Sequence, residues 1–324
     1  MNIRARKEIH ETATTVLDRA PNARRILLVY ISICLGLSLA ISGLSLFFSN
    51  RIAGTGGLGN IGLRSILSTG QSVLPWAQII VNACLTMGYH VAILCIVRNF
   101  EADSRTLLTG FRNIFPILRL LLIQGFLYFG ILIASAYLSS FIFLATPFAA
   151  PFMEVLEPVV ESASVLNQAL VLDEATLLAA MDAMTPMFFI MIPVLGLLAI
   201  PLFYKLRMAN FALADEPRRG ALHALSKSRF LMRRNCFALF RLDLTMWWFY
   251  LGEVVIGLVC YGDMLLPMLG ISLPFSSTVS YYLFYLLSML MQLALYYFGM
   301  NRVYTVYALA YDALQEERIK PLQM

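Results

Sequence analysis

The sequence predicts an all-α membrane protein with six transmembrane helices. Of its 324 residues, 60% are hydrophobic and only 13% are charged, and the mean hydropathy is +0.76. Soluble globular chains average about half apolar residues and about a quarter charged ones. The apolar residues also form long runs of about 20 residues, the length that matches the hydrocarbon thickness of a bilayer. Composition and run length together indicate a chain whose solvent is lipid.

Six apolar runs are long enough to cross a bilayer. They predict spans at about 27–49, 73–97, 115–145, 187–204, 237–261 and 280–300. The third run is longer than a bilayer requires, which predicts a tilted helix or an end outside the membrane. The fourth contains Pro193 and Pro201, which membrane helices tolerate when neighbouring groups satisfy the freed carbonyls. We therefore expect residues 26–324 to form a single membrane domain.

Residues 1–25 precede this domain and contain a predicted amphipathic helix. Between Arg4 and Ala20, apolar residues recur at helical spacing on one side and charged residues occupy the other. Such a helix would lie on the membrane surface, and Pro21 would turn the chain into the bilayer. The apolar run that follows is too long for a signal peptide and lacks an A-x-A cleavage pattern, so we interpret it as a retained span.

The distribution of Lys and Arg predicts the orientation of the chain. Nearly all of these residues lie in the N-terminal segment, between spans two and three, in the basic loop 205–235 and in the C-terminal tail. Only Arg51 and Arg64 lie in the loops on the opposite side. Because positively charged loops stay in the cytoplasm, both termini are predicted to be cytoplasmic. The acidic insert 147–183 would then be external, where its Ala, Leu and Val content suggests one or two short helices.

Charge and cysteine usage limit the partners of the chain. The formal net charge is +5. In a soluble protein this balance would suggest nucleic acid, but here the charge lies in loops beside apolar runs, so anionic lipid headgroups are the expected partner. The five cysteines lie within or beside apolar runs and form no C-x-x-C pair. We therefore predict no disulfide framework, no zinc site and no cofactor.

The sequence contains no pattern typical of a soluble enzyme. A G-x-G-x-x-G pattern, formed by Gly54, Gly56 and Gly59, follows the first span. A dinucleotide-binding fingerprint needs a preceding strand and a following helix, so we interpret this stretch as a flexible external loop. No H-E-x-x-H, G-x-S-x-G or Walker pattern occurs, and the three histidines are dispersed. We predict no catalytic residue, although distant spans could still assemble a membrane enzyme.

One pattern occurs twice in the chain. The motif R-N-x-F-x-x-x-R-L is found at 112–120, where span three begins, and again at 234–242, where span five begins. Each copy follows an amphipathic segment on the cytoplasmic side. The pattern predicts repeated units, each a surface helix with a transmembrane hairpin, in parallel orientation. The N-terminal helix and the first two spans would form a divergent third unit.

The basic loop and the span after it resemble a known family. An alanine-rich stretch at 204–217 runs from a tyrosine to an acidic-proline turn, and the pattern continues at 221–228, at Asn235 and at Trp247 and Trp248. It resembles the domain of unknown function 975 family of bacterial integral membrane proteins. The resemblance implies a helical membrane fold in a bacterial inner membrane. That family has no established activity, so the resemblance implies no catalytic residue.

Glu253 is the main candidate for a functional residue inside the bilayer. It lies near the middle of span five, where an ionised side chain costs about 3 kcal/mol on insertion scales. Arg119, Arg241 and His90 are the candidate partners. The two arginines also lie near enough to the cytoplasmic side to extend to the headgroups, and the histidine fits a packing role as well. The set is compatible with a structural polar lock or with a transport site.

A second candidate site is the predicted helix within 217–234. A helical projection places five residues on an apolar side: Ala221, Leu222, Leu225, Ser228 and Met232. His223 and four basic residues lie on the opposite side, and we expect those four to contact lipid headgroups or a partner: Arg219, Lys227, Arg233 and Arg234. Each would contribute about 1 kcal/mol near an anionic leaflet. Ordinary positive-inside loop charge explains them equally well.

Two functions are compatible with these patterns. The first is a non-enzymatic scaffold whose basic surface helices bind anionic lipids or a membrane-protein partner. The second is a small-solute transporter or channel-like permease with Glu253 in a midplane site. A water-accessible cavity that reaches Glu253 would favour the transporter, whereas a fully packed bundle would favour the scaffold.

Overall fold

The fold is helical throughout the described part of the chain. The computed structural model describes residues 3–54, 61–155, 157, 179, 183–268 and 277–319, and these residues form helices and turns without a strand. Six of the described helices are long and apolar enough to cross a membrane. The predicted all-α fold is therefore confirmed, and the helix lengths and compositions are those of a multi-pass membrane protein.

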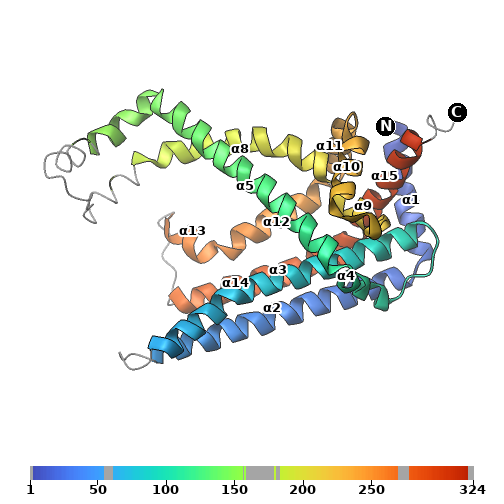
Figure 1. Ribbon diagram of the computed structural model, residues 1–324, viewed down its shortest axis with the longest axis horizontal. Coiled ribbons are helices and arrows are strands. Elements are labelled where there is room, and N and C mark those ends of the chain that lie inside the picture. The colour runs from blue at the N-terminus through green and yellow to red at the C-terminus, as the bar shows by residue number, and fades with distance from the viewer. Residues whose placement is uncertain are drawn as a thin grey trace. The chain divides into compact units, whose positions relative to one another are not determined.

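The chain divides into two compact units, and the first comprises Met1–Leu120 with Leu206–Met324. Its long apolar helices are α2 (Asn22–Gly54), α3 (Ile61–Val97), α12 (Trp247–Cys260) and α14 (Ser277–Leu295). Helix α2 packs against α3, and α12 packs against α14 (Figure 1). A short helix, α13 (Gly262–Met268), follows α12. Helices α2, α3, α12 and α14 provide the walls of the site described below.

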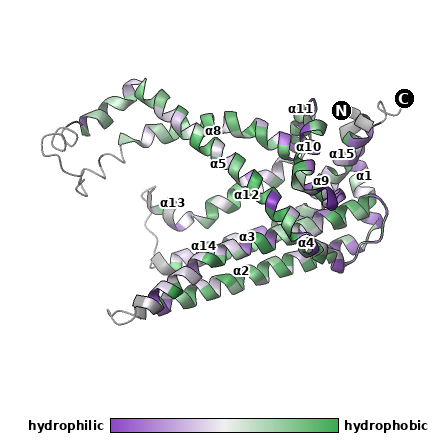
Figure 2. Cartoon of the chain, viewed as in Figure 1, coloured by the Kyte–Doolittle hydropathy of each residue, from purple (hydrophilic) through white to green (hydrophobic). Residues whose placement is uncertain are grey.

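Four further helices, three of them rich in polar residues, gather at one end of these long helices. They are α1 (Ile3–Arg19), α9 (Ala209–Asp215), α10 (Gly220–Met232) and α15 (Asn301–Ile319), and we call them the polar layer. Helix α1 packs on α15, and α9 packs on both α3 and α10. Hydrophilic residues concentrate over this part of the molecule (Figure 2). The predicted N-terminal helix and the predicted helix of the basic loop are both present here.

Two glycines allow the backbones to touch beside the polar layer. A turn, η2 (Ser104–Leu108), and helix α4 (Thr109–Arg112) cross α3 at this point. A Cβ atom added at Gly88 would lie 2.0 Å from the carbonyl oxygen of Leu107, and one added at Gly110 would lie 1.9 Å from that of Cys84. No side chain fits in either place, so both positions require glycine.

The last helix is continuous but changes its winding. Helix α14, a π-helical turn (Tyr296–Met300) and α15 follow one another without a break, so the helix extends far beyond the predicted span 280–300. Within the turn, a Cβ atom added at Gly299 would lie 2.8 Å from the rings of both Trp248 and Phe249. Single π-helical turns within α-helices are frequent at functional sites.

The helix boundaries differ from the prediction in three places. Helix α3 begins at Ile61 rather than near residue 73, so most of the predicted external loop is helical. Gly54 ends α2, while Gly56 and Gly59 lie outside the described residues. Span five is interrupted, with α11 (Cys236–Asp243) and a 3-10 turn (Leu244–Met246) before α12. Of the acidic insert, the turn Pro147–Ala149 and helical residues at 151–155 are described, and most of the remainder lies outside the described residues.

The two copies of the repeated motif form the same local turn. The side-chain amide of Asn113 donates to the carbonyl of Thr109 at 3.2 Å, and that of Asn235 donates to the carbonyl of Leu231 at 3.1 Å. Each asparagine also donates its backbone N–H to the carbonyl three residues earlier and accepts from the N–H four residues later. The motif therefore encodes a helix-to-helix turn at both places. The larger parallel repeat stays a prediction.

The second unit, Leu121–Lys205, contains most of α5 (Ile114–Leu144) and of α8 (Thr185–Leu206). Its large apolar side chains point outward, and four of them are between 72% and 76% exposed: Phe126, Tyr137, Phe141 and Leu197. A water-soluble domain does not leave such a continuous apolar surface uncovered. Contact with lipid accounts for this unit, because lipid removes the need to bury apolar side chains inside the protein.

Candidate functional site

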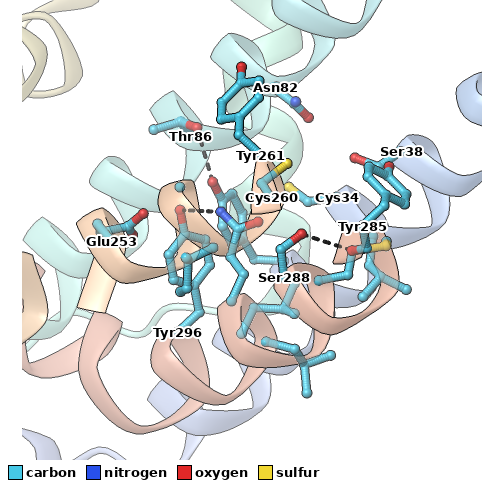
Figure 3. Close-up of a pocket in the computed structure, with 18 residues that line it drawn as sticks. Cys34, Ser38, Asn82, Thr86, Glu253, Cys260, Tyr261, Tyr285, Ser288 and Tyr296 are labelled. Carbon is cyan, nitrogen blue, oxygen red and sulfur yellow. Dashed lines mark hydrogen bonds between the residues drawn. The ribbon is translucent and has the colours of Figure 1, made fainter. Parts of the chain in front are cut away.

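A cavity of about 560 Å³ lies within the first unit. Its walls come from α2, α3, α12 and α14, with Tyr296 of the π-helical turn and Tyr261 at the end of α12 (Figure 3). On the last helix, the lining extends from Tyr285 to Tyr296, a rise of about 16 Å at the helical pitch. This volume falls in the range of small-molecule binding sites.

The lining is polar for a site between apolar helices. Of the described residues that line the cavity, Glu253 alone has an acidic or basic side chain that can ionise near neutral pH. Uncharged polar side chains surround it: Ser38, Asn82, Thr86, Ser288 and Gln292, with the hydroxyls of Tyr30, Tyr261, Tyr285 and Tyr296. Polar groups at such a place cost free energy unless they bind each other, water or a ligand.

Glu253 lies in the middle of α12 and is half-buried. The hydroxyl of Tyr296 is within hydrogen-bonding reach of its carboxylate. Gln292 donates from Nε2 to the same hydroxyl oxygen at 3.2 Å, which leaves the hydroxyl proton free to face Glu253. The π-helical turn thus supplies a neutral donor to the acid. The carboxylate keeps capacity to accept further hydrogen bonds from a bound molecule.

Asn82 is the second notable group on the cavity wall. Its Oδ1 atom is buried and has no hydrogen-bond partner in the described part of the chain. Nearby side chains are paired, since the hydroxyls of Tyr30 and Thr86 lie 3.1 Å apart and Gln78 donates to Ser38 at 3.0 Å. A buried acceptor without a partner costs about 1–3 kcal/mol.

Aromatic rings pack on one another beside the cavity, and of the three described below Tyr30 lines it. Tyr30 stacks on Tyr89 with 5.0 Å between ring centroids, and Tyr304 meets Tyr89 edge-on at 5.3 Å. Tyr89 is fully buried and donates to Oδ1 of Asn301 at 2.6 Å, and Asn301 donates in turn to the carbonyl of Ala23. These bonds join α2, α3 and α15. We call Tyr30, Tyr89 and Tyr304 the aromatic floor.

The structure does not gather the predicted partners around Glu253. Arg119 and Arg241 are exposed, and Arg241 lies over the ring of Phe237 at 4.4 Å. His90 is buried, with Nδ1 2.7 Å from the carbonyl oxygen of Thr86, and its ring packs against the aromatic floor at Tyr304. No ion pair to Glu253 is found among the described residues. Only Glu253 of the predicted set lines the cavity.

Sequence reasoning missed a second cluster of polar groups. Arg207 donates to the hydroxyl of Tyr307 at 2.6 Å and also bonds to that of Tyr250. Tyr307 donates to Oδ1 of the buried Asp243 at 2.6 Å. The guanidinium of Arg207 also lies over the Tyr307 ring at 4.6 Å. The one signal in the sequence was Asp243 itself, an acid within an apolar run.

An ion network joins α3 to the polar layer. Arg98 follows the end of α3 and donates to Asp312 of α15 at 2.7 Å and to Asp215 of α9 at 2.6 Å. Asp215 also accepts from Lys227 at 3.2 Å and from Tyr311 at 3.0 Å. The hydrogen bond to Asp312 is the main reason why the pKa of the Arg98 guanidinium lies above its ordinary value, and the bond to Asp215 raises this pKa as well. The network joins the ends of α3 and α9 to the middle of α10 and of α15.

The four basic residues predicted to contact headgroups divide into two pairs. Lys227 is directed inward to Asp215 and to Glu216, at 2.7 Å from the latter, and only 13% of its side chain is exposed. Arg219 bonds to Glu216 at 2.7 Å. Arg233 and Arg234, by contrast, are exposed at the end of α10. The hydrogen bond from Lys227 lowers the pKa of Glu216.

The predicted apolar side of α10 also needs one correction. Ala221, Leu225, Ser228 and Met232 are buried as expected, but Leu222 is 56% exposed. The helix begins at Gly220, after a 3-10 turn, so its buried side is rotated toward Ala224 and Leu231 rather than Leu222. The same rotation brings Lys227 toward the acids of the preceding turn.

Comparison with known proteins does not assign this chain to a family. No protein-family model, curated protein or solved structure matches the chain. The resemblance to the domain of unknown function 975 family therefore stays a prediction. Within the described residues, no three His, Cys, Asp or Glu side chains gather in a way that would hold a metal ion.

Proposed function

We propose that this protein binds a small solute in the cavity around Glu253 and passes it across a membrane. The observation that carries the proposal is a cavity of about 560 Å³ that reaches an acidic side chain in the middle of an apolar helix. A fully packed bundle would have favoured a scaffold instead. The cavity supports a transporter or permease.

The neighbours of Glu253 favour a binding role over a structural one. A structural acid in an apolar bundle is expected to have a cationic partner, because an unpaired buried charge is strongly destabilising. Glu253 has Tyr296 and Gln292 beside it, and both are neutral. A carboxyl group that lacks an ionic partner in the empty protein is expected where a ligand supplies one.

The proposal includes an orientation in the membrane. We place the polar layer and both termini at the cytoplasmic side of a bacterial inner membrane, as the charge distribution and the family resemblance imply. The aromatic floor then separates the cavity from the cytoplasm. A solute would reach Glu253 from the opposite side, and the floor would have to move for it to leave.

Solute entry into proteoliposomes tests the proposed function. Stopped-flow light scattering would follow the entry of choline, glycerol and glutamate, which represent a cation, a neutral solute and an anion. At least one should enter faster than into protein-free vesicles, and Glu253→Gln should change that rate. Glu8→Gln, an exposed acid on α1, is the matched control and should leave the rate unchanged. Equal entry with and without protein, or no effect of Glu253→Gln, would reject the proposal.

Binding of anionic lipid is a second candidate function for a different surface. Arg233 and Arg234 are exposed, and the ring of Phe237 close by is 62% exposed. Arginines beside exposed rings suit the boundary between headgroups and acyl chains. Replacing both arginines with Gln should reduce the anionic lipids retained in native mass spectrometry, whereas Arg219→Gln should not, because Arg219 is bonded to Glu216. Equal retention by both variants would remove this candidate.

A further inference from the structure

We infer that the solute of the cavity is a small organic ammonium cation. This inference rests on the proposed function and names the chemical class that the cavity selects. Three properties of the lining lead to it: the sign of its charge, the rings in its walls, and its size together with its free acceptors.

The charge of the lining favours a cation. Glu253 supplies the one carboxyl group among the described residues that line the cavity, and none of them is Lys, Arg or His. An anion would meet a carboxylate without any compensating positive group. A cation would instead form a charge-assisted contact with Glu253, and the apolar helices around the cavity strengthen that contact because they lower the local dielectric constant.

The rings in the walls favour an organic cation. Four tyrosines line the cavity. Tyr30 comes from α2, Tyr261 comes from the end of α12, and Tyr285 and Tyr296 come from the last helix. The last three are labelled in Figure 3. The face of a tyrosine ring attracts ammonium groups and contributes about 0.5–2 kcal/mol. Aromatic rings that line a pocket are a recurrent feature of sites for quaternary ammonium ligands.

Size and free acceptors complete the argument. A cavity of about 560 Å³ is far larger than a bare metal ion requires, and ring faces do not coordinate hard cations. The lining also carries hydroxyl groups, those of Ser288 and Tyr285 among them, which can accept from an ammonium N–H or from a hydroxyl of the ligand. Glu253 and one of these hydroxyls would then bind two ends of one molecule.

Two native cysteines allow a direct test. Cys34 and Cys260 line the cavity (Figure 3), whereas Cys84 is buried in the contact with α4 and provides an internal control. Methanethiosulfonate reagents with a trimethylammonium group or with a sulfonate group have similar size and opposite charge. The reagents would be applied to the full chain in nanodiscs, with and without Glu253→Gln. Peptide mass spectrometry would read each cysteine separately.

The ammonium reagent should modify Cys34 and Cys260 about tenfold faster than the sulfonate reagent, after each rate is normalised to a thiol in solution. Glu253→Gln should bring this ratio close to 1, and Glu253→Asp should keep it high. Choline should slow the reaction in the wild-type protein, a result that needs no variant.

Three outcomes separate the possible failures. If neither reagent reaches Cys34 or Cys260, the cavity is closed to water and the proposed function fails with this inference. If both reagents react at equal normalised rates, or the sulfonate reacts faster, the cavity is open but does not select cations, and only this inference is overturned. A high ratio that Glu253→Gln does not change would also overturn it, because the selectivity would then arise elsewhere.

Discussion

The polar layer and the cavity both contain charged and hydroxyl-bearing side chains, but they satisfy them differently. In the polar layer, the one carboxylate of Asp215 accepts hydrogen bonds from Arg98, Lys227 and Tyr311. In the cavity, Glu253 has neutral neighbours and Asn82 has an acceptor without a described partner. Saturated polar networks stabilise a fold, whereas open polar groups cost stability. The difference teaches that one region holds the helices together and the other is kept open for a ligand.

The packed side of this comparison should break most severely at Gly110. In Gly110→Ala the added methyl group would lie 1.9 Å from the carbonyl oxygen of Cys84, so α4 and α3 must move apart. We expect a loss of about 3 kcal/mol in the free energy of unfolding, because backbone cannot yield as a side chain does. Thermal unfolding in detergent would measure it. Gly36→Ala on α2, where nothing lies within 4 Å, is the control.

A comparable unfolding temperature for Gly110→Ala and Gly36→Ala would contradict the described crossing of α3 and α4. Gly88→Ala offers a second test of the same contact, since its methyl group would lie 2.0 Å from the carbonyl oxygen of Leu107.

The next largest effect is expected at the centre of the ion network. Asp215→Asn removes the charge between Arg98 and Lys227, and the Asp215 side chain is only 11% exposed. We expect a loss of about 2–3 kcal/mol, somewhat less than for a fully buried pair because Arg98 is 32% exposed. Asp18→Asn, an exposed acid on α1, should change the unfolding midpoint little. Equal midpoints for the two variants would show that the network does not hold the polar layer.

A smaller, pH-dependent effect is expected at Glu216. The hydrogen bond from Lys227 lowers the pKa of this carboxyl below its ordinary value of 4.5. Its contribution to stability is therefore fully present above pH 4.5 and is lost as the pH falls through the lower pKa of the folded protein. The difference in unfolding midpoint between wild type and Glu216→Gln should shrink on acidification over that range. A difference that is constant from neutral pH to below 4.5 would argue against the bond.

The sequence was sufficient to predict the long helices but not the residues at which they begin and end. Apolar runs fixed the six spans because lipid selects length and composition directly. The start of α3 at Ile61 was missed, since the polar residues around Ser65 and Ser72 interrupt the apolar run without interrupting the helix. The break in span five at Leu244–Met246 was missed as well, because a 3-10 turn leaves no compositional mark.

Only one residue of the candidate site could be predicted from the sequence. Glu253 was found because an acid inside an apolar run is costly and therefore rare. The other walls of the cavity, such as Asn82 and Tyr296, are common residue types whose importance comes from packing between helices that are distant in sequence. Lys227 was placed on the wrong side of α10 for a similar reason, since the acids that attract it precede the helix and are absent from a projection of its residues.

The most direct test of the comparison is the unfolding midpoint of Glu253→Gln, measured in the same nanodiscs as Asp215→Asn. If Glu253 is kept for a ligand, replacing it with the neutral isostere should leave the free energy of unfolding within about 0.5 kcal/mol of the wild-type value or raise it. Asp215→Asn should lower it clearly in the same experiment. A loss for Glu253→Gln as large as that for Asp215→Asn would contradict the account, because Glu253 would then be a structural lock within the bundle.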